Sequence, residues 1–173
     1  MSWGKLLQPD LILGDSILAL TPEVLQAHQL QGLVLDVDET LVPITQSNVS
    51  EILQDWVETI RPVATIWLVS NNISQFRIGS IARTLNLPYI SGAGKPSRRK
   101  LRRAVEAINY PAEQVGMVGD RLFTDVLAGN RLGMFTILVE PMPDPNLEGQ
   151  LMFHTRTFEV WLSKLLGATL KFD

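Results

Sequence analysis

Three carboxylates stand within four positions, directly after an apolar run. The run Gly32–Leu35 is followed by Asp36, Asp38 and Glu39. Carboxylates packed this closely repel one another, and burial makes their ionised forms still less favourable. A hard divalent cation resolves the conflict, because Mg²⁺ binds one or two carboxylates together with water and substrate phosphate. The pattern therefore predicts a magnesium site at the end of a buried strand.

Polar residues also follow three later apolar runs. Ser70 and Asn71 come after the second run, Lys95 after the third, and Asp120 and Asp125 after the fourth. If these runs are strands of a parallel sheet, their carboxyl ends share one edge, where α/β folds bind ligands. We therefore expect three or four carboxylates, a hydroxyl, an amide and one ammonium to meet in one crevice.

This set of groups suits phosphoryl transfer. A carboxylate can attack phosphorus and form an acyl phosphate. A second carboxylate two residues further on can protonate the leaving oxygen and later deprotonate water. A magnesium ion, a lysine and a hydroxyl can neutralise charge on the transferring group. The chain has no cysteine and only two histidines, both far from these motifs, which argues against a soft-metal site.

Strands alternate with helices in the predicted order of elements, which favours an α/β doubly wound parallel sheet. Leu33–Leu35 and Ile66–Val69 are apolar at consecutive positions, as in strands buried on both faces. We expect one domain over residues 1–173, with the motifs in a core of about 32–140. The predicted strands are Gly32–Asp36, Ala64–Ser70, Tyr89–Ser91, Val115–Gly119 and Phe135–Glu140. The predicted helices are Pro22–His28, Ser50–Ile60, Ser74–Asn86, Ser97–Ile108, Thr124–Leu132 and Thr157–Leu166.

The four motifs, in this order, resemble those of the haloacid-dehalogenase (HAD) superfamily of phosphohydrolases. Its DxDxT pattern matches Asp36-Val37-Asp38-Glu39-Thr40, and its GDxxxxD pattern matches Gly119-Asp120 to Asp125. Within the superfamily the chain looks most like the YqeG family, which includes phosphatases acting on phosphatidylglycerophosphate. The segments that carry this finer resemblance are Pro9-Asp10-Leu11, Thr21-Pro22-Glu23, Val69–Asn72 and Gly94-Lys95-Pro96.

The resemblance implies a role for each motif residue. Asp36 is expected to be the nucleophile and Asp38 the general acid and base. Ser70 and Lys95 are expected to bind phosphate and to steady the phospho-aspartate, with Asn71 adding an amide contact. The implied magnesium ligands are Asp36, Asp120, Asp38 through its backbone carbonyl, and Asp125 either directly or through water.

The chain leaves no room for the cap domain that many relatives insert. Leu41–Val49 is one short loop, and Leu87–Lys95 is equally short. We therefore expect an open site, which suits a large or lipid-linked phosphate better than a small metabolite that must be enclosed. The alternative is a lid supplied by an oligomer partner or by the loop Glu140–His154.

The net charge and its distribution along the chain limit the classes of binding partner. The net charge of −3 argues against bulk nucleic-acid binding, so no nucleic acid is expected. The densest charge is the basic run Ser97–Arg103, either a contact for anionic phospholipid or a solvated helix face. The N-terminal segment is too interrupted for a signal peptide or a membrane span, and its apolar side chains either pack on the domain or touch lipid. A cytoplasmic protein is expected, and peripheral contact with the inner membrane surface stays open.

The sequence thus predicts a Mg²⁺-dependent phosphatase that hydrolyses a phosphate monoester through a phospho-aspartate intermediate. Phosphatidylglycerophosphate is the substrate that the family resemblance implies. The alternatives are a HAD phosphatase for nucleotides, sugar phosphates or phosphoproteins, and a non-catalytic module that binds a phosphorylated ligand or RNA.

Overall fold

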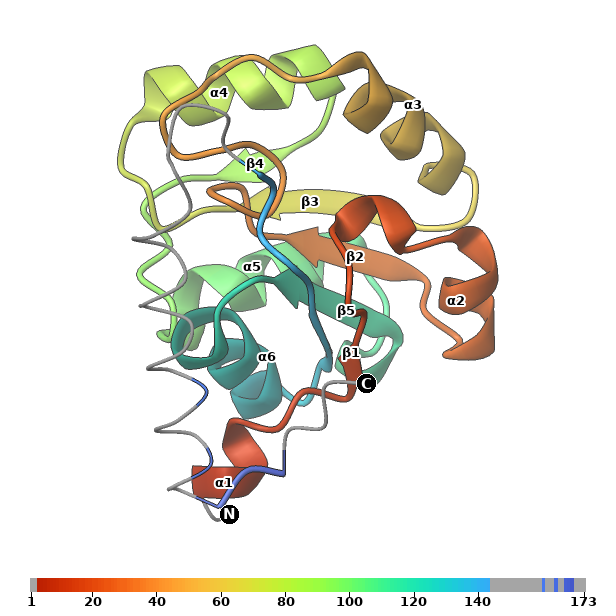
Figure 1. Ribbon diagram of the computed structural model, residues 1–173, viewed down its shortest axis with the longest axis vertical. Coiled ribbons are helices and arrows are strands. Elements are labelled where there is room, and N and C mark those ends of the chain that lie inside the picture. Colours follow the sequence, from red (N-terminus) through yellow and green to blue (C-terminus); the bar gives the residue numbers. More distant parts are fainter. Residues whose placement is uncertain (1–2, 144–159, 161–163, 165–166, 170–173) are drawn as a thin grey trace.

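The computed structural model describes residues 3–143, 160, 164 and 167–169, and its centre is a six-stranded parallel sheet (Figure 1). The strand order is β1-β6-β5-β2-β3-β4, so the predicted α/β parallel sheet is confirmed. The strands are β1 (Leu11–Ile12), β2 (Gly32–Leu35), β3 (Thr65–Val69), β4 (Tyr89–Ile90), β5 (Val115–Gly119) and β6 (Phe135–Leu138). The helices are α1 (Trp3–Leu6), α2 (Pro22–Ala27), α3 (Glu51–Ile60), α4 (Gln75–Leu85), α5 (Arg98–Ile108) and α6 (Leu127–Leu132). Short 3₁₀ turns η1 (Ile17–Ala19) and η2 (Ala112–Gln114) and a π turn η3 (Leu122–Val126) complete the described elements.

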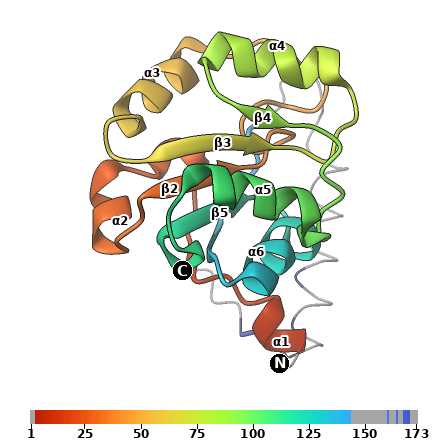
Figure 2. The same ribbon diagram turned by 180° about the vertical axis from the view of Figure 1, so that it is seen from behind.

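Helices cover both faces of the sheet, and the strands are apolar on both faces for that reason. Leu33 and Leu35 pack with α3 and α4, whereas Val34 between them packs with α5. Successive side chains of a strand point to opposite faces, so a doubly covered strand needs consecutive apolar residues. Helix α5 lies behind the strands in Figure 1 and in front of them in the reverse view of Figure 2.

Three serines begin the helices that follow the strand ends. The hydroxyl of Ser50 accepts from Leu53 N at 3.2 Å, and that of Ser74 accepts from Arg77 N at 3.3 Å. Ser97 accepts from Arg99 N at 3.5 Å. A side-chain acceptor satisfies an amide that the first helical turn leaves without a partner. These predicted helices are confirmed, with each boundary within one residue of its expected place.

Three predicted features differ or lie outside the described residues. The helix expected over Thr124–Leu132 begins inside the π turn η3, which starts at Leu122, and it is a regular α-helix only from Leu127. Strand β1 was not predicted, because only two residues pair and Pro9 and Asp10 interrupt the run before them. Most of the predicted helix Thr157–Leu166 lies outside the described residues, although Val160 and Lys164 within it are helical.

The connections that leave the carboxyl ends of β2 and β4 are short. In the described part of the chain no cap domain interrupts the segment between β2 and α3 or the segment between β4 and α5, as expected. Among the residues described, none of the helices combines the length and the apolar character that a membrane crossing requires.

The N-terminal segment packs on the domain. Leu7 is fully buried in a cluster with Leu122 and Leu138. Strand β1 then pairs with β6 at the sheet edge, with Leu11 opposite Ile137. Just before it, the Asp10 carboxylate accepts from the backbone N–H of Thr136 at 2.8 Å and from its hydroxyl at 3.0 Å. Asp10 therefore ties the N-terminal segment to the start of β6.

Replacing this carboxylate should weaken the edge of the sheet. Asp10→Ala leaves the buried Thr136 amide without its acceptor, which should lower the free energy of unfolding by about 1–3 kcal/mol. Urea denaturation should show a lower midpoint with an unchanged slope. The exposed Asp15→Ala serves as the matched control, and an equal midpoint for the two variants would contradict the assigned role of Asp10.

Candidate active site

The strand register brings the predicted carboxylates together. Leu35 pairs with Val118 across β2 and β5, and the Asp36 amide donates to Val118 O at 2.9 Å. Asp36 and Asp120 therefore leave adjacent strand ends. On the other side of β2, the Ala93 amide donates to Ser70 O at 2.9 Å, which fixes the loop carrying Lys95 to the end of β3.

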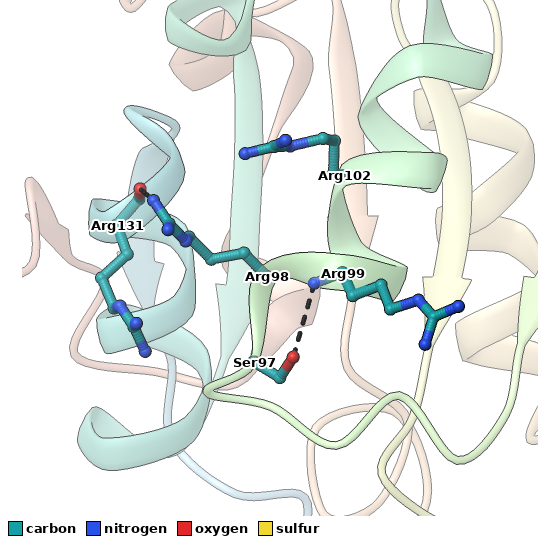
Figure 3. A pocket seen from close by; sticks show the side chains of 5 residues that line it. All are labelled: Ser97, Arg98, Arg99, Arg102 and Arg131. Carbon is teal, nitrogen blue, oxygen red and sulfur yellow. Dashed lines mark hydrogen bonds between the residues drawn. The ribbon is translucent and has the colours of Figure 1, made fainter.

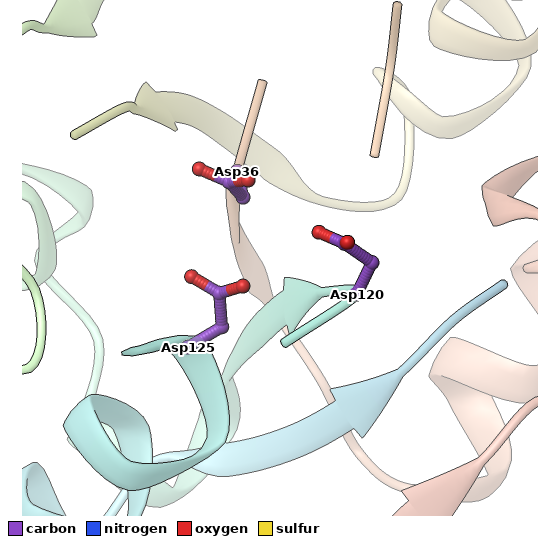
Figure 4. Close-up of side chains that lie close together, drawn as sticks. All are labelled: Asp36, Asp120 and Asp125. Carbon is purple, nitrogen blue, oxygen red and sulfur yellow. The ribbon is translucent and has the colours of Figure 1, made fainter. Parts of the chain in front are cut away.

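Lys95 lies at the centre of the site. Its Nζ is 2.6 Å from Asp36 Oδ1 and 2.7 Å from Asp125 Oδ1, and all three residues are buried. Asp120 stands beside them, and its Oδ1 accepts from the Thr40 hydroxyl at 3.1 Å. The carboxylates of Asp36, Asp120 and Asp125 point toward one another (Figure 4), with one oxygen of each within 4.8 Å of the others.

The π turn η3 directs Asp125 into this cluster. The Arg121 carbonyl accepts from the amides of both Asp125 and Val126, which widens the turn. The Asp125 carboxylate folds back to accept from Arg121 N at 3.2 Å. Gly119 makes the room for it, since a Cβ at that position would lie 2.3 Å from Asp125 Oδ2. The expected glycine–aspartate motif is thus a steric requirement as well as a chemical one.

When its three carboxylates are ionised, the cluster carries more negative than positive charge. Burial raises the pKa of Asp36, the Lys95 ammonium lowers it, and Asp125 raises it again, so that the pKa moves from 3.8 to about 7. Burial, with Asp125 and Asp36 as neighbouring charges, also raises the pKa of Asp120 well above its usual range. Burial alone would lower the pKa of Lys95, but the two carboxylates outweigh it and the pKa is raised. The ammonium stays charged and cannot balance three carboxylates alone.

These residues fit a divalent cation. Three buried carboxylate groups converge, and Asp125 Oδ1, although close to the Lys95 ammonium, accepts no aligned hydrogen bond. A cation beside Asp36, Asp120 and Asp125 would neutralise the excess charge and favour the ionised forms. The Asp38 side chain lies outside this group of oxygens, and the predicted contribution of its backbone carbonyl stays a prediction.

Asp38 is held by a separate set of contacts. Its Oδ2 accepts from the Ser70 hydroxyl at 3.0 Å, and its Oδ1 is paired with the guanidinium of Arg77. Arg77 also donates to Pro43 O and Gln46 O, both at 3.0 Å. One side chain from α4 therefore orients the carboxylate and fastens the loop that follows it. Arg77 lies outside the motifs quoted from the sequence, and the structure pairs it with Asp38.

Asn71 positions the lysine. Its side-chain amide donates to Lys95 O at 3.0 Å and accepts from Lys95 N at 2.7 Å. Both of its polar atoms are therefore used within the protein, and its predicted contact with substrate stays a prediction. The Ser70 hydroxyl likewise accepts from Asn72 N at 2.9 Å while it donates to Asp38.

These groups surround an open pocket of about 270 Å³, hereafter the catalytic pocket. That volume accommodates a phosphate group and its immediate attachment rather than a whole large substrate. Ile44 and Thr124 were not predicted as part of it, since no motif marks a side chain that only lines a wall. The lining residues are Asp36, Asp38, Glu39, Ile44, Asn71, Asn72, Lys95, Arg121, Thr124 and Asp125.

Sequence comparison gives three matches. Residues 92–141 match the model of the HAD-hydrolase-like family. The chain is 36% identical over 128 residues to the Bacillus subtilis protein named probable phosphatase YqeG, covering 73% of this chain and 74% of the relative. It is 27% identical over 149 residues to the chloroplastic phosphatidylglycerophosphate phosphatase 1 of Chlamydomonas reinhardtii, covering 81% of this chain and 55% of the relative.

Solved structures share the fold. A crystal structure of a Listeria monocytogenes protein superposes with a TM-score of 0.54 at 15% identity, covering 79% of this chain and 99% of the other. A Streptomyces avermitilis protein assigned to the HAD hydrolases superposes with a TM-score of 0.52 at 18% identity, covering 92% and 95% of the two chains. At these identities the likeness concerns the arrangement of the sheet and helices.

The raised pKa of Asp36 predicts a particular pH dependence of stability. In metal-free protein the stability that this group contributes is complete below its unfolded pKa of 3.8 and is lost as pH rises through about 7. The free energy of unfolding should therefore fall over this window, by at most about 4 kcal/mol for this group. Added Mg²⁺ should offset the loss at high pH, because it binds the ionised carboxylates.

Asp36→Asn is the control for this effect. Urea denaturation in EDTA across the window should give a flatter pH profile for the variant than for the wild type. Equal slopes in the two proteins would mean that Asp36 titrates alike in the folded and unfolded states.

Proposed function

The chain belongs to the YqeG-type phosphatases of the HAD superfamily, and from this premise we propose a Mg²⁺-dependent hydrolysis of phosphate monoesters through a phospho-Asp36 intermediate. One observation carries the proposal. The Asp36 carboxylate is buried at the end of β2, 2.6 Å from the Lys95 ammonium, and Asp38 lines the same catalytic pocket two residues further on. A nucleophile, a cation for the phosphate oxygens and an acid thus share one small volume.

In the first step an Asp36 oxygen attacks phosphorus while the bond from phosphorus to the ester oxygen breaks. Asp38, in its protonated form, gives its proton to the departing oxygen, so the alcohol leaves neutral. Lys95 stays charged in its buried place between Asp36 and Asp125, and offsets negative charge on the phosphoryl oxygens.

In the second step water attacks phosphorus, and Asp38 accepts its proton. The bond between phosphorus and the Asp36 oxygen breaks, which releases inorganic phosphate and restores the carboxylate. When bound, Mg²⁺ supplies a Lewis acid for the phosphoryl oxygens, and Asp36, Asp120, Asp125 and the Asp38 carbonyl are the groups proposed to hold it. Thr40 keeps Asp120 oriented through the 3.1 Å hydrogen bond to its Oδ1.

We propose a lipid-linked phosphate monoester, such as phosphatidylglycerophosphate, as the substrate. The support is the name of the Chlamydomonas reinhardtii relative and the shape of the catalytic pocket, which is open and holds about 270 Å³. A pocket of this size can take the phosphate head while the bulk of a lipid stays outside. A substrate that must be enclosed would need a cap, and the described residues contain none.

Phosphate release from a substrate panel tests the proposal. The panel contains phosphatidylglycerophosphate, p-nitrophenyl phosphate, a nucleotide and a sugar phosphate, each with Mg²⁺ and with EDTA. Release should need Mg²⁺, favour the lipid, and fall on the order of 10³-fold or more in Asp36→Asn. The exposed Asp15→Asn should retain wild-type activity. No release from any substrate by the folded protein would refute hydrolysis, and preference for a soluble ester would refute the lipid assignment.

Arg77 should act as a positioning residue through Asp38. Arg77→Met frees the Asp38 carboxylate and the loop at Pro43, so kcat should fall about 10–100-fold for an alkyl phosphate, whose leaving oxygen needs a proton. The loss should be smaller for p-nitrophenyl phosphate, whose leaving group needs little protonation. Arg77→Lys should recover part of the activity. Equal losses on both substrates would indicate a general structural effect instead.

A further inference from the structure

Two large apolar side chains are exposed to solvent beside the catalytic pocket. Ile73 is 85% exposed and Phe76 is 84% exposed, and together they are called the apolar tip. Asn71 and Asn72, immediately before Ile73, line the catalytic pocket. Ile44, which lines the pocket itself, is also 51% exposed. Apolar groups gathered next to a functional opening mark a surface for a partner or a membrane.

The apolar tip is held in place by hydrogen bonds on both sides. Asn72 N donates to the Ser70 hydroxyl at 2.9 Å, and Asn72 O accepts from Gly92 N at 2.8 Å. Ser74 N then donates to the Asn72 side chain at 2.9 Å, and Ser74 caps α4. The backbone is therefore fixed before and after Ile73, and the side chain is presented outward by a bonded turn.

A second feature lies between the start of α5 and the last turn of α6. A pocket of about 620 Å³, larger than the catalytic pocket, is lined by arginines from the start of α5 and from α6 (Figure 3). Arg98 donates to Arg131 O at 3.2 Å, and Arg131 donates to Pro96 O at 3.1 Å. This arginine pocket consists of Ser97, Arg98, Arg99, Arg102 and Arg131.

The arginine pocket lacks compensating negative charge. Across the described residues, none of its four guanidinium groups forms an ion pair with a carboxylate. Three of the arginines also lie in the first two turns of α5, where the helix dipole already provides positive potential. This arrangement is unfavourable in isolation and becomes favourable when an anion with several oxygens occupies it.

The apolar tip and the start of α5 lie at the edge of the sheet that holds the catalytic pocket. Helices α4 and α5 both begin where strands β3 and β4 end, so their first turns share one edge while their bodies cover opposite faces. The loop at Gly92 joins them, because a Cβ there would lie 3.5 Å from both Ile73 Cγ2 and Lys100 Nζ. The apolar tip, the catalytic pocket and the first turn of α5, which carries Arg98 and Arg99, thus lie at one edge of the sheet.

We propose that this edge docks on the surface of an anionic phospholipid bilayer. Ile73 and Phe76 enter the interface between headgroups and acyl chains, and the arginine pocket binds lipid phosphates beside them. Docking brings the catalytic pocket to the level of the headgroups, where a phosphate monoester on a lipid would project. The inference rests on the proposed function for the identity of the substrate. Its own evidence is the exposure of the apolar tip together with the charge of the arginine pocket, which is unpaired within the described residues.

The combination favours a bilayer over a nucleic acid. RNA would neutralise the arginines but would leave the two side chains of the apolar tip in water. A bilayer interface accepts apolar side chains and presents phosphates at the same depth. The acidic net charge of −3 leaves this basic pocket as a local feature, not part of a general polyanion-binding surface.

Vesicle sedimentation with Ile73→Ser/Phe76→Ser tests the apolar tip. Wild-type protein should bind vesicles of phosphatidylcholine and phosphatidylglycerol, and the variant should bind about tenfold or more weakly. Val63→Ser/Tyr110→Ser is the matched control, since both residues are exposed apolar side chains at the opposite, amino-terminal edge of the sheet. The control should bind as the wild type does. Equal binding by wild type and the tip variant would overturn the proposal.

Neutralising the arginine pocket tests the charge. Arg98→Gln/Arg102→Gln, which changes two side chains on the same side of α5 (Figure 3), should remove most of the preference for anionic over pure phosphatidylcholine vesicles, by about fivefold for each arginine. Arg83→Gln, exposed on the last turn of α4 at the other edge, should keep the preference. Salt-sensitive RNA binding that depends on Arg98 and Arg102 but not on the apolar tip would overturn the bilayer in favour of RNA.

Hydrolysis of p-nitrophenyl phosphate separates docking from chemistry. The tip variant should hydrolyse this soluble ester at the wild-type rate while losing about tenfold in activity on a phospholipid monoester in vesicles. Vesicle binding by a protein that hydrolyses neither compound would support docking and refute the proposed function. Hydrolysis of the soluble ester by a protein that binds no vesicles would support the function and overturn docking.

Discussion

The burial of Lys95 between Asp36 and Asp125 is the interaction on which the rest of the site depends. An ammonium inside the protein is unfavourable unless carboxylates surround it, and here two lie at 2.6 and 2.7 Å. Those carboxylates come from the end of β2 and from the turn before α6, while the lysine comes from the loop after β4. One charge therefore links three separate segments. The side-chain amide of Asn71 holds the Lys95 backbone in place through its N–H and its carbonyl.

The same charges that stabilise the lysine also make the site incomplete. With Asp120 added, three carboxylates face one ammonium, and the raised pKa values of Asp36 and Asp120 express the imbalance. A site that is already neutral has no electrostatic reason to bind a cation or to develop a nucleophile. The excess negative charge here favours binding of a cation, at the cost of stability in the protein without metal.

Much of this arrangement was predictable from sequence, for identifiable reasons. Consecutive apolar residues in Leu33–Leu35 allow only a doubly covered strand, and the polar residue after each such run must then lie at the carboxyl edge. Arg77 was not assigned, because its reach to Asp38 depends on the packing of α4 and not on any spacing in the chain. The short strand β1 and the π turn were missed for a related reason. Strand β1 is held by a few hydrogen bonds to the distant strand β6, and the π turn by one carbonyl that accepts two amides. Neither leaves a periodic pattern in the sequence.

The π turn at Leu122–Val126 has a consequence for how this segment tolerates change in length. Each residue of an α-helix rotates the side-chain direction by about 100°, so the wide turn lets two neighbouring stretches face different ways. Asp125 faces the lysine, while Leu127 and Ala128 face the sheet and the N-terminal segment. Deleting one residue here would restore a regular helix and keep only one of these two directions. The extra residue thus allows one helical segment both to direct Asp125 to the lysine and to bury Leu127 and Ala128. Without it, only one of these two orientations could be kept.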